Sequence, residues 1–350
     1  MSVLNVVLPL GSSVLSFVFA AMVLDQWWQR RKAFQLVWGI GLLWYGISTG
    51  CEFVGGAFGW SEPLYRAWYL VGAFFVAAYL GAGTIYLLSK TRFGYFAGVT
   101  VLMGGFLSLV FSHDTATYPG STTAGVVALV IASFGGIAII ATTAVRRRLA
   151  PHIAMGVLVI GSVAVAYMTL TAGAASPGWV VDPSTHVPVG SGLPGYVRVL
   201  TGPFNIAGAL CLVFGAIYSA YVYMPKRKVL RAKVSTPVLA QLYGVAGVAV
   251  NLVASLPTAT RALVRGKLHS RVPATLLIAA GAFIPGLTTG LSRFGITWSF
   301  FLGQFLGVLL IFAGFLVSEE VFRNIRIGGT IWSRASSERA LATDTSTHGS

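Results

Sequence analysis

The stretch TTAGVVALVIASFGGIAIIATTAVRRR, from Thr122 to Arg148, joins 24 uncharged residues to three consecutive arginines. An α-helix of about 20 predominantly apolar residues spans the hydrocarbon core of a bilayer. Basic residues are enriched in the cytoplasmic loops of membrane proteins. The stretch therefore predicts a transmembrane helix over 122–145 that ends at the cytoplasmic face.

The composition extends this prediction to the whole chain. Of its 350 residues 56% are hydrophobic and 9% are charged, whereas about a quarter are charged in soluble proteins. A transmembrane β-barrel would need alternating segments of about ten residues. We therefore expect an all-α, polytopic transmembrane helical bundle. Its net charge of +15 is explained by basic loops, so it does not indicate a nucleic-acid partner.

About nine crossings are expected within a single transmembrane domain, residues 1–322. They are 5–24, 34–57, 66–88, 94–112, 122–145, 151–174, 198–222, 273–291 and 297–318.

A cleavable signal peptide has basic residues before its apolar run, and none precedes the first run here. We therefore expect that run to be retained as a helix.

The basic residues predict the orientation. With these crossings, all of the 24 Lys and Arg residues but Arg66, Arg198 and Arg293 fall on one side. That side is expected to be the cytoplasm, with the N-terminus outside and the C-terminus inside the plasma membrane. Membrane lipids are then the expected partners, with anionic lipids at the cytoplasmic face.

One apolar run, 237–257, has basic residues on both flanks. Small and polar residues recur on one helical face, as at Asn251 and Ser255. We expect an interfacial or re-entrant cytoplasmic helix, and the alternative is a tenth crossing. Residues 323–350 lose the apolar pattern, so a disordered cytoplasmic tail is expected.

Glycine pairs predict close packing between the last two helices. Gly286 with Gly290, and Gly303 with Gly307, are small-xxx-small patterns that permit close backbone approach.

Glu52 is the clearest ionisable residue within a predicted span. Trp38, Tyr45 and Glu52 are seven residues apart, which places them on one helical face. A buried carboxylate needs a partner, so we expect an ion pair with Arg198 or Arg66. Such a pair either only fixes the helix register or forms an anion or head-group site. The candidate ligand-binding residues, with the third external arginine, are Glu52, Arg66, Arg198, Arg293, Tyr45 and Trp38.

Aromatic residues lie close to this layer, at Trp60, Tyr65, Trp68 and Tyr69. They are expected to form an interfacial belt, where amphipathic rings favour the head-group level.

No cofactor, metal or catalytic residue is predicted. All lysines lie in predicted cytoplasmic loops, so none is placed for a retinal Schiff base. The histidines are not paired within the predicted spans as bis-histidine haem ligation needs, and zinc-hydrolase patterns are missing.

Two parts of the chain carry a resemblance. The first runs from Gln35 to Tyr69 and includes Trp44-Tyr45, Cys51-Glu52-Phe53 and Leu64-Tyr65-Arg66; the second runs from Leu291 to Val317. They resemble an uncharacterised family of bacterial multi-pass membrane proteins. The passage between the second and third predicted helices is also similar to the seven-helix input domains of bacterial membrane sensors. That likeness implies sensing, with a separate protein partner supplying the output domain that this chain lacks.

These observations favour a non-enzymatic membrane protein that binds a lipid head group or small amphiphile, or that serves in sensing or assembly. Two alternatives stay open. A transporter would need charges near the bilayer midplane and an internal repeat. A membrane enzyme acting on a lipid or isoprenoid would need a second catalytic group within reach of Glu52.

Overall fold

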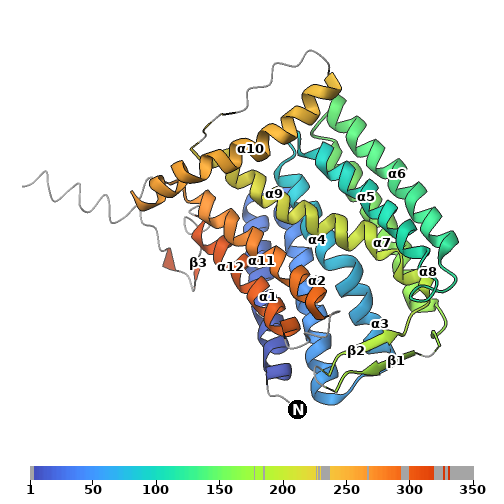
Figure 1. The fold of residues 1–350 in the computed structure, drawn as a ribbon. Coiled ribbons are helices and arrows are strands. Elements are labelled where there is room, and N and C mark those ends of the chain that lie inside the picture. The colour runs from blue at the N-terminus through green and yellow to red at the C-terminus, as the bar shows by residue number, and fades with distance from the viewer. Residues whose placement is uncertain are drawn as a thin grey trace, which may run out of the picture. The chain divides into compact units, whose positions relative to one another are not determined.

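A computed structural model describes residues 4–176, 178–183, 186–225, 227, 229, 237–265, 268–292, 299–318, 326–327 and 330–331. The all-α prediction is confirmed for these residues. The elements are α1 (Leu4–Arg30), α2 (Ala33–Phe58), α3 (Glu62–Tyr69), η1 (Leu70–Phe75), α4 (Val76–Leu87), α5 (Phe93–Ser112), α6 (Thr122–Val145), α7 (Ala150–Thr171), β1 (Gly178–Val181), β2 (Pro188–Ser191), α8 (Gly195–Arg198), η2 (Gly202–Ile206), α9 (Ala207–Tyr223), α10 (Pro237–Val264), α11 (Arg271–Ser292), α12 (Ser299–Val317), β3 (Arg326–Ile327) and β4 (Thr330–Ile331) (Figure 1). The segments η1 and η2 are π-helical and continue directly into α4 and α9.

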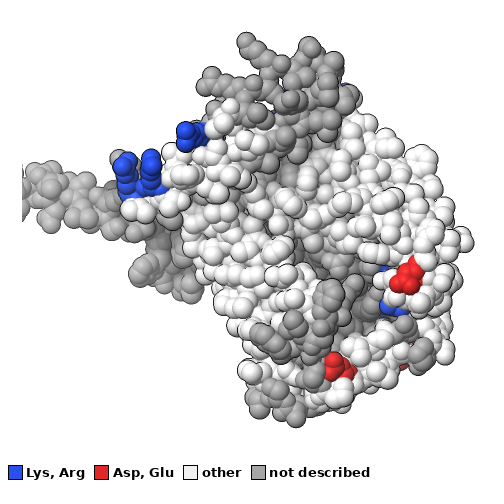
Figure 2. Space-filling model, viewed as in Figure 1, with Lys and Arg blue, Asp and Glu red and all other residues white. Residues whose placement is uncertain are grey.

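Eight helices in the described part of the chain are long and apolar enough to cross a membrane. They are Leu4–Arg30, Glu62–Leu87, Phe93–Ser112, Thr122–Val145, Ala150–Thr171, Gly195–Tyr223, Arg271–Leu291 and Ser299–Val317. Most of the surface in Figure 2 carries neither basic nor acidic side chains. Many large hydrophobic side chains are exposed, such as Phe134 and Ile160, as expected for a helical membrane protein that faces lipid.

The one predicted crossing without a counterpart among these eight, 34–57, corresponds to the 26-residue helix α2. It is not among the eight, because its Trp, Tyr and Gly residues and Glu52 make it less apolar. It nevertheless runs antiparallel to α1 along its length, with Gly39 facing Leu24 near one end and Gly50 facing Ser13 towards the other. A membrane crossing by α2 therefore stays a prediction, supported by its pairing with an apolar helix.

The chain divides into two compact units. Unit 1 comprises Met1–Ala216 and Ala279–Leu310, and unit 2 comprises Ile217–Ile278 and Ile311–Ser350. The candidate residues that the structure describes belong to unit 1, and the single domain expected over 1–322 stays a prediction.

In unit 2, the polar face predicted for 237–257 binds the preceding segment. The Asn251 side-chain oxygen accepts a hydrogen bond from the Val229 backbone N–H at 2.8 Å, and the Ser255 hydroxyl accepts one from Arg227 N–H at 2.9 Å. Both residues are buried. Because α10 is not among the eight candidate spans, an interfacial or re-entrant position stays our prediction for it.

The glycine pairs of the last two helices differ in their surroundings. Gly303 and Gly307 face Thr288 and Pro285 of α11, as the packing prediction requires. Among the described residues, no atom lies within 4 Å of a Cβ placed on Gly286 or Gly290. The tail over 323–350 lies outside the described residues except for the short antiparallel pair β3–β4.

A close crossing of α5 and α6 supplies a test of the packing in unit 1. A Cβ atom on Gly98 would lie 2.6 Å from the Gly136 carbonyl oxygen, and one on Gly136 would lie 2.7 Å from the Gly98 carbonyl oxygen. Side chains at these positions would force the two helices apart.

We expect Gly98→Ala to destabilise the protein by about 1–3 kcal/mol, the usual range for overpacking. The matched control is Gly156→Ala, because no atom lies within 4 Å of a Cβ at that position of α7. Thermal unfolding in detergent should show a lower midpoint for Gly98→Ala only. Equal midpoints for the two variants would contradict this packing.

Candidate functional site

Glu52 lies at the junction of three helices of unit 1. Its side chain, on α2, is 2% exposed. The Oε1 atom accepts hydrogen bonds from Trp68 Nε1 of α3 at 2.9 Å and from Gln304 Nε2 of α12 at 3.0 Å. The other oxygen, Oε2, has no hydrogen-bond partner among the described residues. The carboxyl group thus joins α2, α3 and α12 through neutral donors.

The predicted ion pair of Glu52 with Arg66 is not formed. Arg66 instead contacts Glu62 Oε1 at 2.7 Å and donates from Nη1 to the Thr169 carbonyl oxygen of α7 at 2.6 Å. The reason is helical geometry. Residues two apart in a helix differ in direction by about 200°, so when Trp68 reaches Glu52, Arg66 faces α7.

Arg198 does not pair with Glu52 either, because it is held at the loop between α5 and α6. It donates to the Thr117 carbonyl oxygen at 3.0 Å, and its guanidinium lies 5.0 Å from the centre of the Tyr118 ring. It also hydrogen-bonds the Tyr69 hydroxyl. The third candidate, Arg293, lies outside the described residues.

The shared face predicted for Trp38, Tyr45 and Glu52 is realised in part. The Tyr45 hydroxyl donates to the Gln304 carbonyl oxygen at 2.8 Å, so Tyr45 and Glu52 meet the same residue of α12. Trp38 instead donates to the Leu80 carbonyl oxygen of α4 at 3.0 Å. The ligand-binding role of these residues stays a prediction.

Sequence reasoning missed Gln304 and Trp68 as the partners of Glu52. The aromatic residues around Trp68 pack against one another and against the β1–β2 hairpin, and their position in an interfacial belt stays a prediction. The Trp60 and Trp68 ring centres are 5.4 Å apart, and Tyr65 stacks on Trp179 of β1 at 5.4 Å. An amide within a predicted span was the one available signal for Gln304.

The loop between α5 and α6 carries both signs of charge. The pKa of Asp114 lies below its usual range, because the side chain and backbone of Thr117 hydrogen-bond to the carboxylate. Asp114 is therefore ionised at neutral pH, while Arg198 binds the carbonyl oxygen of the same Thr117.

An apolar cavity of about 500 Å³ is a further candidate site in unit 1. Its walls come from α4, α5, α6, α7, η2 and α9, with Tyr196 and Leu200 near its α8 end. Many of the lining residues are small, including Ala78, Gly81, Ala124, Ala128, Ala154, Gly161, Ala164, Ala207 and Gly208. Because such residues are also common where helices pack closely, the sequence did not indicate a cavity here.

Arg198 is close in the chain to residues that line one end of this cavity. Gly120 and Thr123 at the start of α6 line that end together with Tyr196 and Leu200. Arg198 lies between the last two in the chain and binds the loop that leads to Gly120. Arg198 itself is not among the residues that line the cavity.

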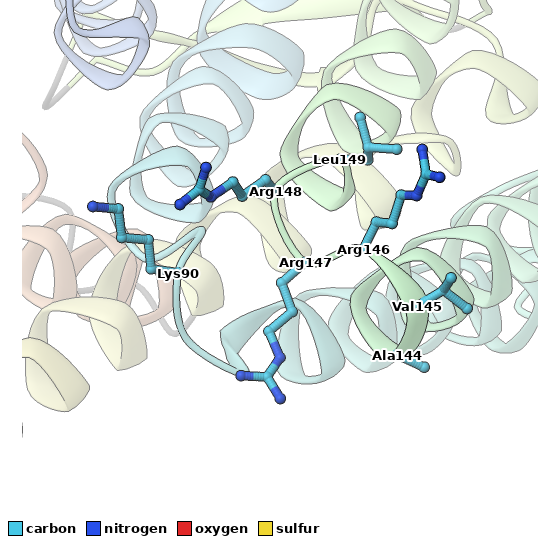
Figure 3. Close-up of a pocket in the computed structure, with 7 residues that line it drawn as sticks. All are labelled: Lys90, Ala144, Val145, Arg146, Arg147, Arg148 and Leu149. Atoms are coloured by element: carbon cyan, nitrogen blue, oxygen red, sulfur yellow. The ribbon is translucent and has the colours of Figure 1, made fainter.

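A second, basic hollow of about 670 Å³ lies where α6 passes into α7. Lys90, Arg146, Arg147 and Arg148 line it together with Ala144, Val145 and Leu149, and the basic side chains spread in different directions around the loop (Figure 3). No acidic residue lines this hollow. Its chemistry suits an anion.

Other chemistry finds little support in the described part of the chain. No three His, Cys, Asp or Glu residues there come together in a way that could hold a metal ion. No protein-family model, curated protein or solved structure matches this chain. The family resemblance inferred from the sequence stays a prediction.

The bonds of Arg66 to Glu62 and to the Thr169 carbonyl oxygen are expected to contribute differently to the stability of the protein. Glu62 is 55% exposed, so its ion pair is expected to contribute at most about 1 kcal/mol. Thr169 O belongs to the last turn of α7, where carbonyls lack helical partners and a cation is favourable. We expect Arg66→Gln to lower stability by about 1–3 kcal/mol and Glu62→Gln by less. Thermal unfolding of both variants in detergent measures the difference, and an equal loss for both would argue against the bond to Thr169.

Proposed function

We propose that this protein binds an amphiphile whose apolar chain occupies the cavity between α4, α5, α6, α7 and α9. The cavity carries the proposal. Its volume of about 500 Å³ falls in the range of about 300–1,000 Å³ that is typical of ligand sites. Its apolar walls offer almost no partners for water, and an apolar cavity of this kind stays dry in soluble proteins.

Within a membrane the natural occupant of such a space is a hydrocarbon chain. Empty space deprives the lining atoms of dispersion contacts, and a chain restores them. The outward faces of α6 and α7 are apolar, with Phe134 and Ile160 each 74% exposed, so these helices offer lipid-facing surfaces beside the cavity. This supports access from the bilayer.

The polar end of the amphiphile is proposed to lie near Arg198. A guanidinium presents several N–H donors in a plane and suits carboxylate or phosphate groups. Asp114 on the same loop is ionised, so a zwitterionic head group also matches the charges there. In this proposal Glu52 does not contact the ligand, which departs from the head-group role predicted for it from the sequence.

A transporter is the second candidate, and one observation favours it. The π-helical segments η1 and η2 interrupt two of the apolar helices, and the Phe74 and Phe204 rings lie edge to face at 5.4 Å. Such irregularities are frequent at functional sites. Proteoliposomes that release a lipid analogue in a protein-dependent way would favour transport over binding alone.

We further propose a plasma-membrane location with the N-terminus outside. The basic hollow then faces the cytoplasm, where anionic lipids attract Lys and Arg by about 1 kcal/mol each. Its four cations and the absence of an acid in its lining support this side.

Cavity filling tests the binding proposal. The double variant Ala154→Leu/Ala164→Leu adds bulk to two residues of the lining, whereas the control Ala141→Leu adds it to an exposed position of α6 outside the lining. We expect crosslinking of a photoreactive diazirine analogue of palmitic acid to fall about tenfold in the double variant, which corresponds to a loss of about 1.4 kcal/mol in binding free energy. In the control variant the crosslinking should equal that of the wild-type protein. Unchanged crosslinking in a folded double variant would refute the proposed site.

Cysteine labelling tests the orientation. In a background without Cys51 and Cys211, Arg147→Cys should react with a membrane-impermeant maleimide only in inverted vesicles. The reverse is expected for Ala116→Cys, which lies in the exposed loop between α5 and α6. Labelling of Arg147→Cys in intact cells would overturn the orientation and leave the cavity proposal standing.

A further inference from the structure

The two oxygens of Glu52 have very different surroundings. Both donors that reach the carboxyl group, from Trp68 and Gln304, bind Oε1. Oε2 is buried and has no donor among the described residues. An indole N–H can only donate, so Oε1 is an acceptor in any assignment of the amide orientation. This asymmetry is that of a carboxylic acid, with a carbonyl oxygen at Oε1 and a hydroxyl at Oε2.

The described elements packed around Glu52 offer no cation to balance a negative charge. On α3, Arg66 is turned towards Thr169 and Glu62, and α12 contains no charged residue. On α1, Asp25 and Arg30 lie at the end opposite to the one that meets this part of α2. The titratable neighbours on α2 itself, Tyr45 and Cys51, are neutral groups. An isolated buried carboxylate would cost several kcal/mol.

The side-chain amide of Gln304 also has an oxygen without a hydrogen-bond donor. Its Nε2 donates to Glu52 Oε1, while its own Oε1 is buried without a donor. A carboxamide and a carboxylic acid each hold one donor and one acceptor group, so they satisfy each other. A carboxylate and a carboxamide leave one acceptor on each side unsatisfied, as the two orphan oxygens show.

We propose that Glu52 is a proton-binding site: in the folded protein its Oε2 carries a proton, supplied by solvent, which it donates towards Oε1 of Gln304. With this proton, Glu52 Oε2 becomes a donor and Gln304 Oε1 accepts its hydrogen bond, so both atoms have a partner. This site is separate from the cavity and does not depend on the function proposed for it.

The proton also governs how three helices are joined. Gln304 accepts the Tyr45 hydroxyl at its carbonyl oxygen and bonds Glu52 through its side chain, so this end of α12 is held to α2 at one residue. Loss of the proton would leave a negative charge facing the amide oxygen. The joint between α2, α3 and α12 is therefore expected to weaken when Glu52 ionises.

Infrared spectroscopy of the full chain in lipid vesicles tests the site at neutral pH. A protonated carboxyl group has a carbonyl stretch that carboxylates lack, and the stretch shifts in D₂O. The wild-type protein should show this band, Glu52→Gln should lose it completely, and Glu62→Gln should retain it. Gln304→Leu should move the band to higher frequency because a hydrogen bond to the carbonyl is lost. A wild-type spectrum without the band, or a band that persists in Glu52→Gln, would overturn the proposal.

Thermal unfolding over pH gives a second readout. The folded protein holds the proton that the unfolded chain releases at neutral pH, where a free Glu ionises at about pH 4.3. Stability is then lost as pH rises through the titration of the folded state. Glu52→Gln keeps both a donor and an acceptor, so its midpoint should lack the wild-type fall with pH. An equal fall in both proteins would contradict a role for Glu52.

Discussion

The hydrocarbon that surrounds this chain supplies no hydrogen bonds, and this constraint governs the rest of the structure. Backbone groups are satisfied within helices, and several buried hydroxyl groups bond back to their own helix, although the Ser13 hydroxyl donates to the Gly46 carbonyl oxygen of α2. Ser16 donates to the Ser12 carbonyl oxygen at 2.6 Å, Thr84 to the Leu80 carbonyl oxygen at 3.1 Å and Thr143 to the Ile139 carbonyl oxygen at 2.7 Å. Side-chain bonds between helices are therefore concentrated at a small number of residues, of which Glu52 and Gln304 are the clearest pair.

Helix packing also determines where space for a ligand remains in unit 1. Where glycines meet closely, as at Gly98 and Gly136, backbones approach and little space is left. The apolar cavity is lined by residues from several helices, many of them Ala and Gly. Its lining is almost entirely apolar, with Thr123 and Tyr196 towards the α8 end. This distribution is the basis for the proposal that a ligand places its apolar chain within the cavity and its head group at that end.

The sequence predicted the bounds of a helix well where a single apolar run determines them. The predicted span 122–145 coincides with α6, and 94–112 differs from α5 by one residue at its start. It predicted partners poorly, because a partner depends on the rotation of two helices about their axes. Glu52 was correctly identified as a buried polar residue, but Arg66 faces away from it because Trp68 faces towards it. Gly286 and Gly290 show the same limit, since a packing motif does not say which side of a helix meets a neighbour.

We propose above all that an amphiphile occupies the apolar cavity lined by α4, α5, α6, α7 and α9. The most direct test is an electron cryo-microscopy structure of the protein in nanodiscs that retain its co-purified lipids. The account predicts continuous, chain-shaped density along Ala128, Ala154 and Ala164 that ends near Arg198. A map in which α6 and α7 close over the space, or in which it is empty in a well-ordered protein, would contradict it.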